Sequence, residues 1–496
     1  MYRQIVDQVR AAVGDGRLRP GTRLPAIRAL AARLDLNRDT VSLAYEQLVR
    51  EGVVVSQVGR GTFVRERTQP QPQANADNAP PAHSAGTLSE PVERLLQLDS
   101  ARPRYDTRDG AVPLHSLVPD PSLYPIKSFR RALNRALNEG GTDLLVYGGH
   151  RGEDALREVI AARLAAYGAG LEPDNVVLCQ GASQGVSLAM RLYAREGEYV
   201  AVEEPTYHNV LGVITGLGLN AVPVPMTPRG PDLAALDAAL ARPEVKLFYT
   251  MPSFHNPMGI TIDRAHRMAM LEIAARRGKP LIEDAFEMDL RYSGRSVLPL
   301  IGLAKGTAAE ELVVHLFSFS KSLFPGVRIG SVTARGRAVD GLLALKYSTD
   351  LSGVPIVQAA VAEFVTSGGY DRHLTRLRKT LRERRDVMLE ALACEMPEGS
   401  TWTRPDGGYQ VWVEVPEPID TRLLLADCAR AGLLFAPGYM FHQNGHSLGH
   451  ASRAMRLTTA LADADEIARG IAILGRTTKQ YLRQSMAPTR GREVHV

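Results

Sequence analysis

Cysteine is scarce in this sequence. Only three of the 496 residues are cysteines, and Cys179, Cys394 and Cys428 lie far apart. This spacing argues against a disulfide framework and a cysteine-based metal knuckle, and it is typical of proteins in a reducing compartment. The sequence also lacks a signal-peptide pattern and an apolar run long enough to span a bilayer. We therefore expect a cytoplasmic protein with no membrane partner.

Lysine is missing from the first 66 residues, which hold eleven arginines and seven acidic residues. Their net charge is thus 11 − 7 = +4, compared with +5 for the whole chain. This concentration of positive charge favours nucleic-acid binding to a modest degree. An arginine-rich solvated surface is the alternative interpretation.

Large apolar residues are almost absent from residues 67–92, where Gln, Pro, Asn, Ala and Ser dominate. Such a composition predicts a linker, because it cannot bury enough apolar surface to fold. We divide the chain into a domain over 1–66, a linker over 67–111, a second domain over 112–475 and a basic tail over 476–496. Within the second domain, residues from about 370 to 475 are expected to form a smaller subdomain.

The first domain is predicted to contain three helices and a two-stranded wing. Helices are expected over 2–15, 26–34 and 38–52, and short strands over 53–58 and 62–64. Asn37 is placed to cap the third helix. A winged helix-turn-helix of this kind reads DNA by placing the start of its third helix in the major groove.

Several motifs of this domain are specific: Gly16-x-Leu-x-Pro-Gly-x-Arg-Leu-Pro25, Arg28-x-Leu-Ala31 and Gly59-Arg-Gly-Thr-Phe-Val64. In these motifs the first 66 residues resemble the winged-helix domain of the GntR regulator family. The resemblance implies DNA contacts from Arg28, Asn37, Arg38, Thr40 and Gly59. Arg38 suits a bidentate contact with guanine, whereas Arg28 and Thr40 suit phosphate. Asp39 departs from this pattern, because a carboxylate at this position repels phosphate. It can instead accept a hydrogen bond from a cytosine amino group or cap the helix.

Strands and helices alternate from about residue 112 onward. Buried strands are predicted over 176–179, 199–202, 221–224, 247–250, 280–282 and 313–317. Helices are predicted over 128–138, 152–166, 184–194, 231–241, 263–277, 356–367 and 370–395. This order predicts an α/β domain whose mostly parallel sheet carries helices on both faces, followed by a small α+β subdomain. Ligands of such sheets bind at the carboxyl ends of the strands.

One lysine stands among hydroxyl residues directly after the last predicted strand, in the stretch Ser318-Phe-Ser-Lys-Ser-Leu-Phe-Pro-Gly-Val-Arg-Ile-Gly330. A lysine amine becomes a good nucleophile when its surroundings lower its pKa, and Schiff-base chemistry with an aldehyde cofactor is the usual purpose. The hydroxyls and Arg328 suit a phosphate group. A solvated lysine after a strand is the alternative for this stretch taken alone.

Four further motifs follow predicted strands. Gln180-Gly-Ala-Ser-Gln-Gly185 opens a helix and suits phosphate, although it also matches the G-x-S-x-G elbow of hydrolases with Ser183 as nucleophile. No oxyanion loop of the His-Gly-Gly type accompanies it, which disfavours the hydrolase. Tyr207 can stack on a flat ring, and Asn256 can face a ring oxygen. Asp284 can hold a pyridine nitrogen protonated.

In this order the motifs resemble the pyridoxal-phosphate site of fold-type I aminotransferases, over roughly residues 112–475. The resemblance implies that Lys321 bonds covalently to pyridoxal phosphate and that Asp284 pairs with the pyridine nitrogen. It also implies that Asn256 bonds the ring hydroxyl and that Tyr207 stacks on the ring. The phosphate would be held by Gly181, Ala182, Ser183, Ser318 and Arg328.

The same resemblance extends to a second subunit and to a substrate. Tyr147 would reach a phosphate in the neighbouring subunit, which implies a homodimer, and Arg456 would clamp a substrate α-carboxylate. This sequence departs from the family pattern at two positions, one beside the cofactor ring and one on the side that faces the substrate. Phe286 stands where the family usually has a tyrosine that donates to the ring oxygen, and Asn209 stands where one branch carries a basic residue.

Three histidines, His442, His446 and His450, cluster in a loop rich in Gly and Ser. No cysteine or acid stands beside them at ligand spacing, so we expect a solvated loop and no metal.

A winged helix fused to an aminotransferase-like domain resembles the MocR subfamily of GntR regulators. We therefore predict a homodimeric transcriptional regulator that binds double-stranded operator DNA. Its second domain is expected to sense pyridoxal phosphate or a small amino-group effector. A catalytically active aminotransferase with a residual DNA-binding domain is the alternative.

Overall fold

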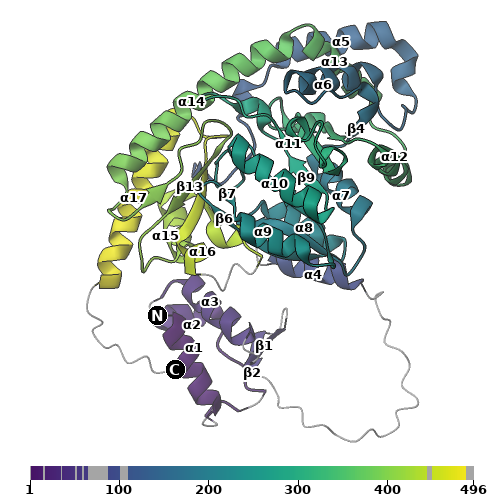
Figure 1. Cartoon of the computed structure of the whole chain (residues 1–496). Helices are drawn as coiled ribbons and strands as arrows, with labels where there is room; N and C mark the ends of the chain where they lie inside the picture. The colour runs from purple at the N-terminus through teal and green to yellow at the C-terminus, as the bar shows by residue number, and fades with distance from the viewer. Residues whose placement is uncertain are drawn as a thin grey trace, which may run out of the picture. The chain divides into compact units, whose positions relative to one another are not determined.

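The computed structural model describes residues 2–14, 17–19, 21–34, 36–50, 53–57, 61–64, 88–100, 110–443 and 449–486 (Figure 1). The chain forms two compact units, one of residues 1–87 with 482–496 and one of residues 88–481. Among the described residues, no helix combines the length and the apolar character needed to cross a bilayer.

The described residues of the first unit form three helices and a two-stranded antiparallel sheet. Its elements are α1 (Tyr2–Gly14), α2 (Ile27–Leu34), α3 (Arg38–Arg50), β1 (Val54–Gln57) and β2 (Gly61–Val64). Ile5 and Val9 of α1, Leu30 of α2, and Val41 and Leu48 of α3 are buried together. Within α1 and α3 these residues are four or seven positions apart, so each of these helices turns one apolar face inward. The predicted helices and wing are confirmed, with ends that differ by at most two residues.

The second unit is built of alternating helices and strands. Its main helices are α4 (Glu90–Ser100), α5 (Ile126–Gly140), α6 (Asp154–Ala166), α7 (Ala182–Tyr193), α8 (His208–Gly216), α9 (Leu233–Ala241), α10 (Arg264–Arg277), α11 (Leu300–Leu303), α12 (Arg337–Asp350), α13 (Pro355–Thr366), α14 (Gly369–Glu395), α15 (Thr421–Ala431), α16 (Gly449–Arg453) and α17 (Ala464–Met486). Within the described part of the chain, seven short 3-10 helices connect some of them: Pro121–Leu123, Gly141–Leu145, Pro173–Asn175, Met288–Leu290, Glu310–Leu312, Pro325–Val327 and Gly438–Phe441.

Eight strands form the large sheet of this unit, in the order β4-β11-β10-β9-β8-β5-β6-β7. They are β4 (Val176–Cys179), β5 (Tyr199–Glu204), β6 (Asn220–Thr227), β7 (Gly230–Pro231), β8 (Val245–Thr250), β9 (Leu281–Asp284), β10 (Val313–Ser318) and β11 (Gly330–Thr333). The strands from β10 to β6 pair in parallel, whereas β11 is antiparallel to both β10 and β4. The short edge strand β7 is antiparallel to β6. The mostly parallel sheet is therefore confirmed, with two short antiparallel strands, β11 and β7, that the sequence pattern did not predict.

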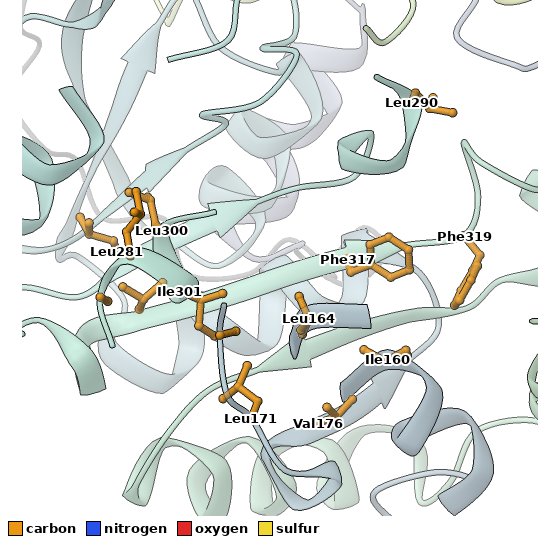
Figure 2. Close-up of a cluster of buried hydrophobic side chains, with 14 of the residues drawn as sticks. Ile160, Leu164, Leu171, Val176, Leu281, Leu290, Leu300, Ile301, Phe317 and Phe319 are labelled. Carbon is orange, nitrogen blue, oxygen red and sulfur yellow. The ribbon is translucent and has the colours of Figure 1, made fainter. Parts of the chain in front are cut away.

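Both faces of the large sheet are buried, which explains why its strands are continuously apolar. Val176 and Phe317 face one cluster, to which α6 contributes Ile160 and Leu164 and α11 contributes Ile301 (Figure 2). The alternate strand residues face a second cluster with α7, α8 and α12: Val177, Cys179, Val202, Leu247, Ile282, Val314, Leu316 and Val332. Because helices cover both faces of the sheet, the ends of its strands remain uncovered.

A second sheet of four strands follows in the chain. It has the order β12-β13-β16-β15, built from β12 (Thr401–Trp402), β13 (Gln410–Glu414), β15 (Ala436–Pro437) and β16 (Ala454–Thr458). A short parallel pair joins β14 (Leu433–Leu434) to β3 (Val112–Pro113). Helices α14 and α17 run side by side (Figure 1). Gly475 of α17 lies against the backbone of Glu395 of α14. This arrangement agrees with the small α+β subdomain predicted from about residue 370.

Two segments expected to be irregular are partly helical. The range 67–111, expected to be a linker, contains α4, whose Leu95 lies over Gly216 of α8. The polar composition ends at residue 92, and the leucines that follow give α4 an apolar side. The range 476–496, expected to be a tail, begins with the last turns of α17, and its residues 487–496 lie outside the described part.

Candidate functional site

Four parallel strands end at one edge of the large sheet, and a cavity opens there. β5 ends at Glu204, β8 at Thr250, β9 at Asp284 and β10 at Ser318. The cavity has a volume of about 260 Å³. Its lining includes Leu117, Ala182, Ser183, Tyr207, Asn209, Asn256, Asp284, Phe286, Ser318, Ser320, Lys321 and Arg328. Most of the predicted cofactor residues thus meet in one place, although they come from distant parts of the chain.

Asp284 lies at the end of β9 and is almost completely buried. The Tyr249 hydroxyl donates a hydrogen bond of 2.7 Å to its Oδ2 atom. Burial raises the pKa of Asp284 to about 6, although the Tyr249 hydroxyl and the nearby Phe286 amide oppose the rise. The Oδ1 atom is buried and completes no hydrogen bond with the described residues. A lone buried acceptor of this kind fits the N–H of a protonated pyridine ring.

Asn256 is buried beside the same cavity and is held by Arg456. The Arg456 Nη1 atom donates 3.0 Å to Asn256 Oδ1, and Nη2 donates 2.7 Å to the carbonyl of His115. The Asn256 Nδ2 atom is buried and has no hydrogen-bond partner among the described residues, so it fits a phenolic ring oxygen. Arg456 is buried next to the cavity and is not among the residues that line it.

Lys321 lies in the turn after β10, and its amine is held at the cavity wall. The Nζ atom donates 2.9 Å to the carbonyl of Leu117, and the Tyr409 hydroxyl donates 2.6 Å to the carbonyl of Lys321. Burial lowers the pKa of Lys321, the carboxyl of Glu287 opposes this, and Arg456 lowers it further. A lowered amine pKa is what a lysine nucleophile requires.

One end of the cavity is formed by Arg328 and the start of α7, which together suit an anion. Arg328 adopts a left-handed conformation (φ 49°), and its Nη2 atom donates 2.9 Å to the carbonyl of Gln180. Gly181 has φ 85°, and a Cβ atom there would lie 2.9 Å from Arg328 Nη2, so glycine is required. Ala182 and Ser183 begin α7, where unpaired backbone amides favour a phosphate.

Polar side chains support this loop from behind. Lys346 is fully buried, and its Nζ atom donates 2.6 Å to Oδ1 of Asp350. Gln184 donates 2.9 Å to Oδ2 of Asp350 and accepts 2.7 Å from the backbone amide of Gln180. These bonds fix the loop that begins α7 without using a group at the cavity wall.

Two aromatic rings line the cavity on the side of α8. The rings of Tyr207 and Phe286 are nearly parallel, at 15°, with centroids 6.5 Å apart. Asn209 Nδ2 donates 2.7 Å to the Tyr207 hydroxyl, so this residue orients the tyrosine.

Tyr147 does not lie in the cavity. Its side chain is 85% exposed, next to exposed Leu145 and Val146. Tyr347 and Leu351 are also exposed. The ring of Tyr347 contacts the ring of His150, three residues after Tyr147, with centroids 4.7 Å apart. Within one chain Tyr147 therefore contributes nothing to the cavity.

Four of the five predicted DNA-contacting residues lie in the described part of the first unit. Arg28 and Arg38 are exposed, and Thr40 is half-buried. Asn37 caps α3, since its Oδ1 atom accepts 3.1 Å from the backbone amide of Asp39. Gly59 lies outside the described residues.

The histidine cluster shows no metal geometry within the described range. No group of three or more potential ligands was found there, and His446 lies outside it. His442 is largely buried, in contrast to the solvated loop that we expected, and burial lowers its pKa to about 4.

Several residues of the site were not predicted from the sequence. Tyr249, Glu287, Tyr409 and Gln410 are buried and bond to Asp284, to Lys321 or to each other. Glu287 lies three residues after Asp284, in a stretch that already holds the acids Glu283 and Asp284, so no local signal distinguishes it. Tyr409 and Gln410 come from the second sheet, whose approach to Lys321 no local pattern reveals.

Comparisons with known proteins agree with this architecture. Residues 118–474 match the family Aminotransferase class I and II, and residues 1–64 match the bacterial regulatory proteins of the gntR family. The HTH-type transcriptional regulator YdcR of Escherichia coli is 30% identical over 97% of this chain and 99% of its own length. The probable rhizopine catabolism regulatory protein MocR of Rhizobium meliloti is 28% identical over 91% of this chain and 90% of its own.

A solved structure resembles the second unit. The α-aminoadipate aminotransferase LysN of Thermus thermophilus, in complex with N-(5'-phosphopyridoxyl)-L-leucine, has a TM-score of 0.70 and 30% identity. The match covers 80% of this chain and 96% of LysN. The winged helix and the fold-type I domain thus occur here in one chain, as they do in full-length regulators. The chain therefore belongs to the aminotransferase class I and II family and, with its GntR-type winged helix, to the MocR subfamily of GntR transcriptional regulators.

Proposed function

We propose that this regulator binds pyridoxal phosphate in the cavity of its second unit, and that occupancy by this cofactor or by an amine that reacts with it alters operator binding. Two unsatisfied buried atoms carry the proposal: the acceptor Asp284 Oδ1 and the donor Asn256 Nδ2 line one cavity with Lys321. Leaving such atoms without partners costs about 1–3 kcal/mol each, which a ligand with matching groups would recover.

Each end of the cavity suits one part of the cofactor. Lys321 supplies the amine for the covalent link, and Asp284 accepts from the ring nitrogen. Arg328, Ser183 and the start of α7 hold the phosphate. When bound, the cofactor supplies an electron sink for bonds at the carbon of a reacting amine. The complex of LysN with a phosphopyridoxyl amino acid supports this assignment.

Helix α8 offers a physical route from the cavity to the chain segment that leads to the winged helix. Val210 and Val213 of α8 line the cavity. On the same helix, Gly212 and Gly216 lie against Leu95 of α4, the first described helix after residues 65–87. A ligand that shifts α8 would therefore shift the base of the connection. This is a population-shift mechanism, in which the ligand binds one arrangement more tightly than the other.

The regulator is expected to act as a homodimer. Leu145, Val146 and Tyr147 expose more than half of their surface, and so do Tyr347 and Leu351. Several exposed apolar side chains gathered in this way are typical of a protein interface. A partner seated there would bring its Tyr147 close to the phosphate end of this cavity, which makes the site complete only in the dimer.

Operator binding is the experiment that tests this function. The full-length chain is titrated onto its own upstream DNA at one salt concentration, with and without pyridoxal phosphate. We expect specific binding whose affinity changes at least about threefold with the cofactor, and we expect Lys321→Ala to abolish the change. Lys379→Ala, which alters an exposed lysine of α14, is the matched control and should respond as the wild type does. An identical response of the Lys321 variant would overturn the proposal.

A second candidate function is transamination, favoured by the presence of Lys321, Asp284 and Asn256 in one cavity. Turnover of a common amino donor and a 2-oxo acid by the full-length chain would support it. The test requires that Lys321→Ala abolishes the turnover, because contaminating aminotransferases would otherwise give the same signal.

A further inference from the structure

Residues 114–120 follow β3 and contribute Leu117 to the cavity wall, and we call this segment the strap. Three successive backbone carbonyls of the strap accept hydrogen bonds from β16. The bonds run to Leu114 from the Thr458 amide (2.9 Å), to His115 from Arg456 Nη2 (2.7 Å) and to Ser116 from Thr458 Oγ1 (2.6 Å). Both donor residues are buried. The first half of the strap is therefore bound to the small subdomain.

The two ends of the strap are attached to the same subdomain. Directly before it, β3 pairs with β14. At its end, the Asp120 amide donates 2.9 Å to the carbonyl of Ala460, and buried Arg384 of α14 donates 2.6 Å to the Asp120 carboxylate. A movement of the small subdomain would therefore carry the strap with it.

The middle of the strap is held by a residue of the large sheet. The Leu117 carbonyl accepts 2.9 Å from Nζ of Lys321, which lies in the turn after β10. The side chains of Leu117 and Lys321 line the same cavity. The hydrogen bond that ties the strap to this turn thus comes from the amine that the proposed function requires as a nucleophile.

Lys321 loses the hydrogens of this bond when its amine reacts with an aldehyde cofactor. The nitrogen bonds to the aldehyde carbon, the carbon–oxygen bond breaks, and the oxygen leaves as water with two hydrogens of the neutral amine. A free amine can turn a hydrogen towards Leu117, because it rotates about a single bond. After the reaction the nitrogen keeps at most one hydrogen, which the planar double bond fixes in one direction.

We propose that the strap reports the chemical state of Lys321: the free amine holds the strap at the cavity, and its bond to the cofactor releases the strap to move with the small subdomain. This rests on the proposed function, in which pyridoxal phosphate links to Lys321. Leu117 acts through its backbone carbonyl as a positioning group for the amine. The chain therefore responds to the aldehyde form of the cofactor, which consumes the amine, and not to the amine form, which leaves it free.

Hydrogen exchange of the strap in the full-length chain tests the proposal. The Val118 amide belongs to the same peptide group as the Leu117 carbonyl, so release of the carbonyl exposes this amide to exchange. In the cofactor-free protein, Lys321→Met removes the donor and should raise the exchange rate of the Val118 amide at least about threefold. The Asp120 amide, which Ala460 holds, should keep its rate. Lys379→Met, a change of an exposed lysine of α14, is the matched control and should leave both rates unchanged.

The wild-type chain supplies a second measurement that does not depend on the folding of a variant. Pyridoxal phosphate should raise the exchange rate of the Val118 amide as Lys321→Met does. Pyridoxamine phosphate, which carries an amine in place of the aldehyde, should leave this rate unchanged. Absorbance spectra of the same samples report whether each compound is bound and whether it is linked to the protein.

Four results would overturn the proposal. They are an unchanged Val118 rate in Lys321→Met, equal increases at Val118 and Asp120, an unchanged Val118 rate with linked pyridoxal phosphate, and an equal increase with bound pyridoxamine phosphate. Absence of a linked cofactor from the spectra would instead count against the proposed function. The comparison of cofactor-free chains uses no ligand, so it decides in either case whether Lys321 holds the strap.

Discussion

The hydroxyl of Tyr249 donates a hydrogen bond of 2.7 Å to Oδ2 of Asp284 and leaves Oδ1 of the same carboxylate without a partner among the described residues. The two residues come from neighbouring parallel strands, β8 and β9. The carboxylate is therefore oriented by the protein through one oxygen and is available to a ligand through the other. Its burial is costly in the absence of a ligand.

This cost predicts how stability depends on pH. The pKa of Asp284 rises from 3.8 to about 6 on folding, so its ionisation destabilises the cofactor-free fold above pH 6, and this penalty is lost as the pH falls towards 4. Asp284→Asn removes the dependence. Between about pH 5 and pH 8, the free energy of unfolding of the variant should rise by about 1–3 kcal/mol relative to the wild type.

Tryptophan fluorescence is a suitable measurement, because both tryptophans, Trp402 and Trp412, lie in the second unit. Asp340→Asn, which changes an exposed acid of α12, serves as the control and should show no such difference. A pH-independent difference between Asp284→Asn and the wild type would contradict the expectation.

Arg328 should recognise the phosphate and not the ring. Arg328→Ala is expected to weaken binding of pyridoxal phosphate about 10- to 100-fold, the size of a lost charged hydrogen bond. The affinity of the same variant for pyridoxal, which lacks the phosphate, should fall by less than about threefold. Absorbance titrations of the two ligands make the comparison. Equal losses for both would mean that Arg328 chiefly maintains the loop through its bond to Gln180.

Tyr147 should serve the site of the partner subunit. Mixed dimers of Tyr147→Ala and Lys321→Ala chains test this, because one of their two sites would then combine an intact Lys321 with an intact Tyr147. We expect half of the sites to bind pyridoxal phosphate with wild-type affinity, as measured by absorbance titration. If Tyr147 acted in its own chain, no site of the mixed dimer would be intact.

Arg38, exposed at the start of α3, should contribute to operator specificity. Arg38→Ala is expected to weaken operator binding by about 1–3 kcal/mol and to affect unrelated DNA much less. Fluorescence anisotropy at fixed salt measures both affinities. Arg10→Ala, on the exposed side of α1, is the control and should leave the preference for the operator unchanged. A uniform loss on all sequences would instead assign Arg38 to phosphate.

Local pattern was sufficient for much of the fold. The strand Val176–Cys179 was predicted with the bounds that it has, and the long helix predicted over 370–395 runs from Gly369 to Glu395. Long apolar or amphipathic runs bounded by polar residues carry enough local information for this. Strand β11 was not predicted because its first residue, Gly330, ends the motif of Lys321, and its sequence Gly-Ser-Val-Thr holds one large apolar residue, in contrast to the apolar run of Val176–Cys179. Helix α4 was not predicted because it begins inside the polar stretch of residues 67–92.

The two-domain architecture and the order of the strand-end motifs follow from local sequence, since parallel strands carry their ligands at one end and the motifs follow the strands. Only the tertiary structure decided which atoms are left for a ligand. The partners of Asp284, Asn256 and Lys321 are Tyr249, Arg456 and Tyr409, which lie 35, 200 and 88 residues away in the chain. Hydrogen bonds across strands and between sheets depend on distance in space, and no periodicity along the chain records them.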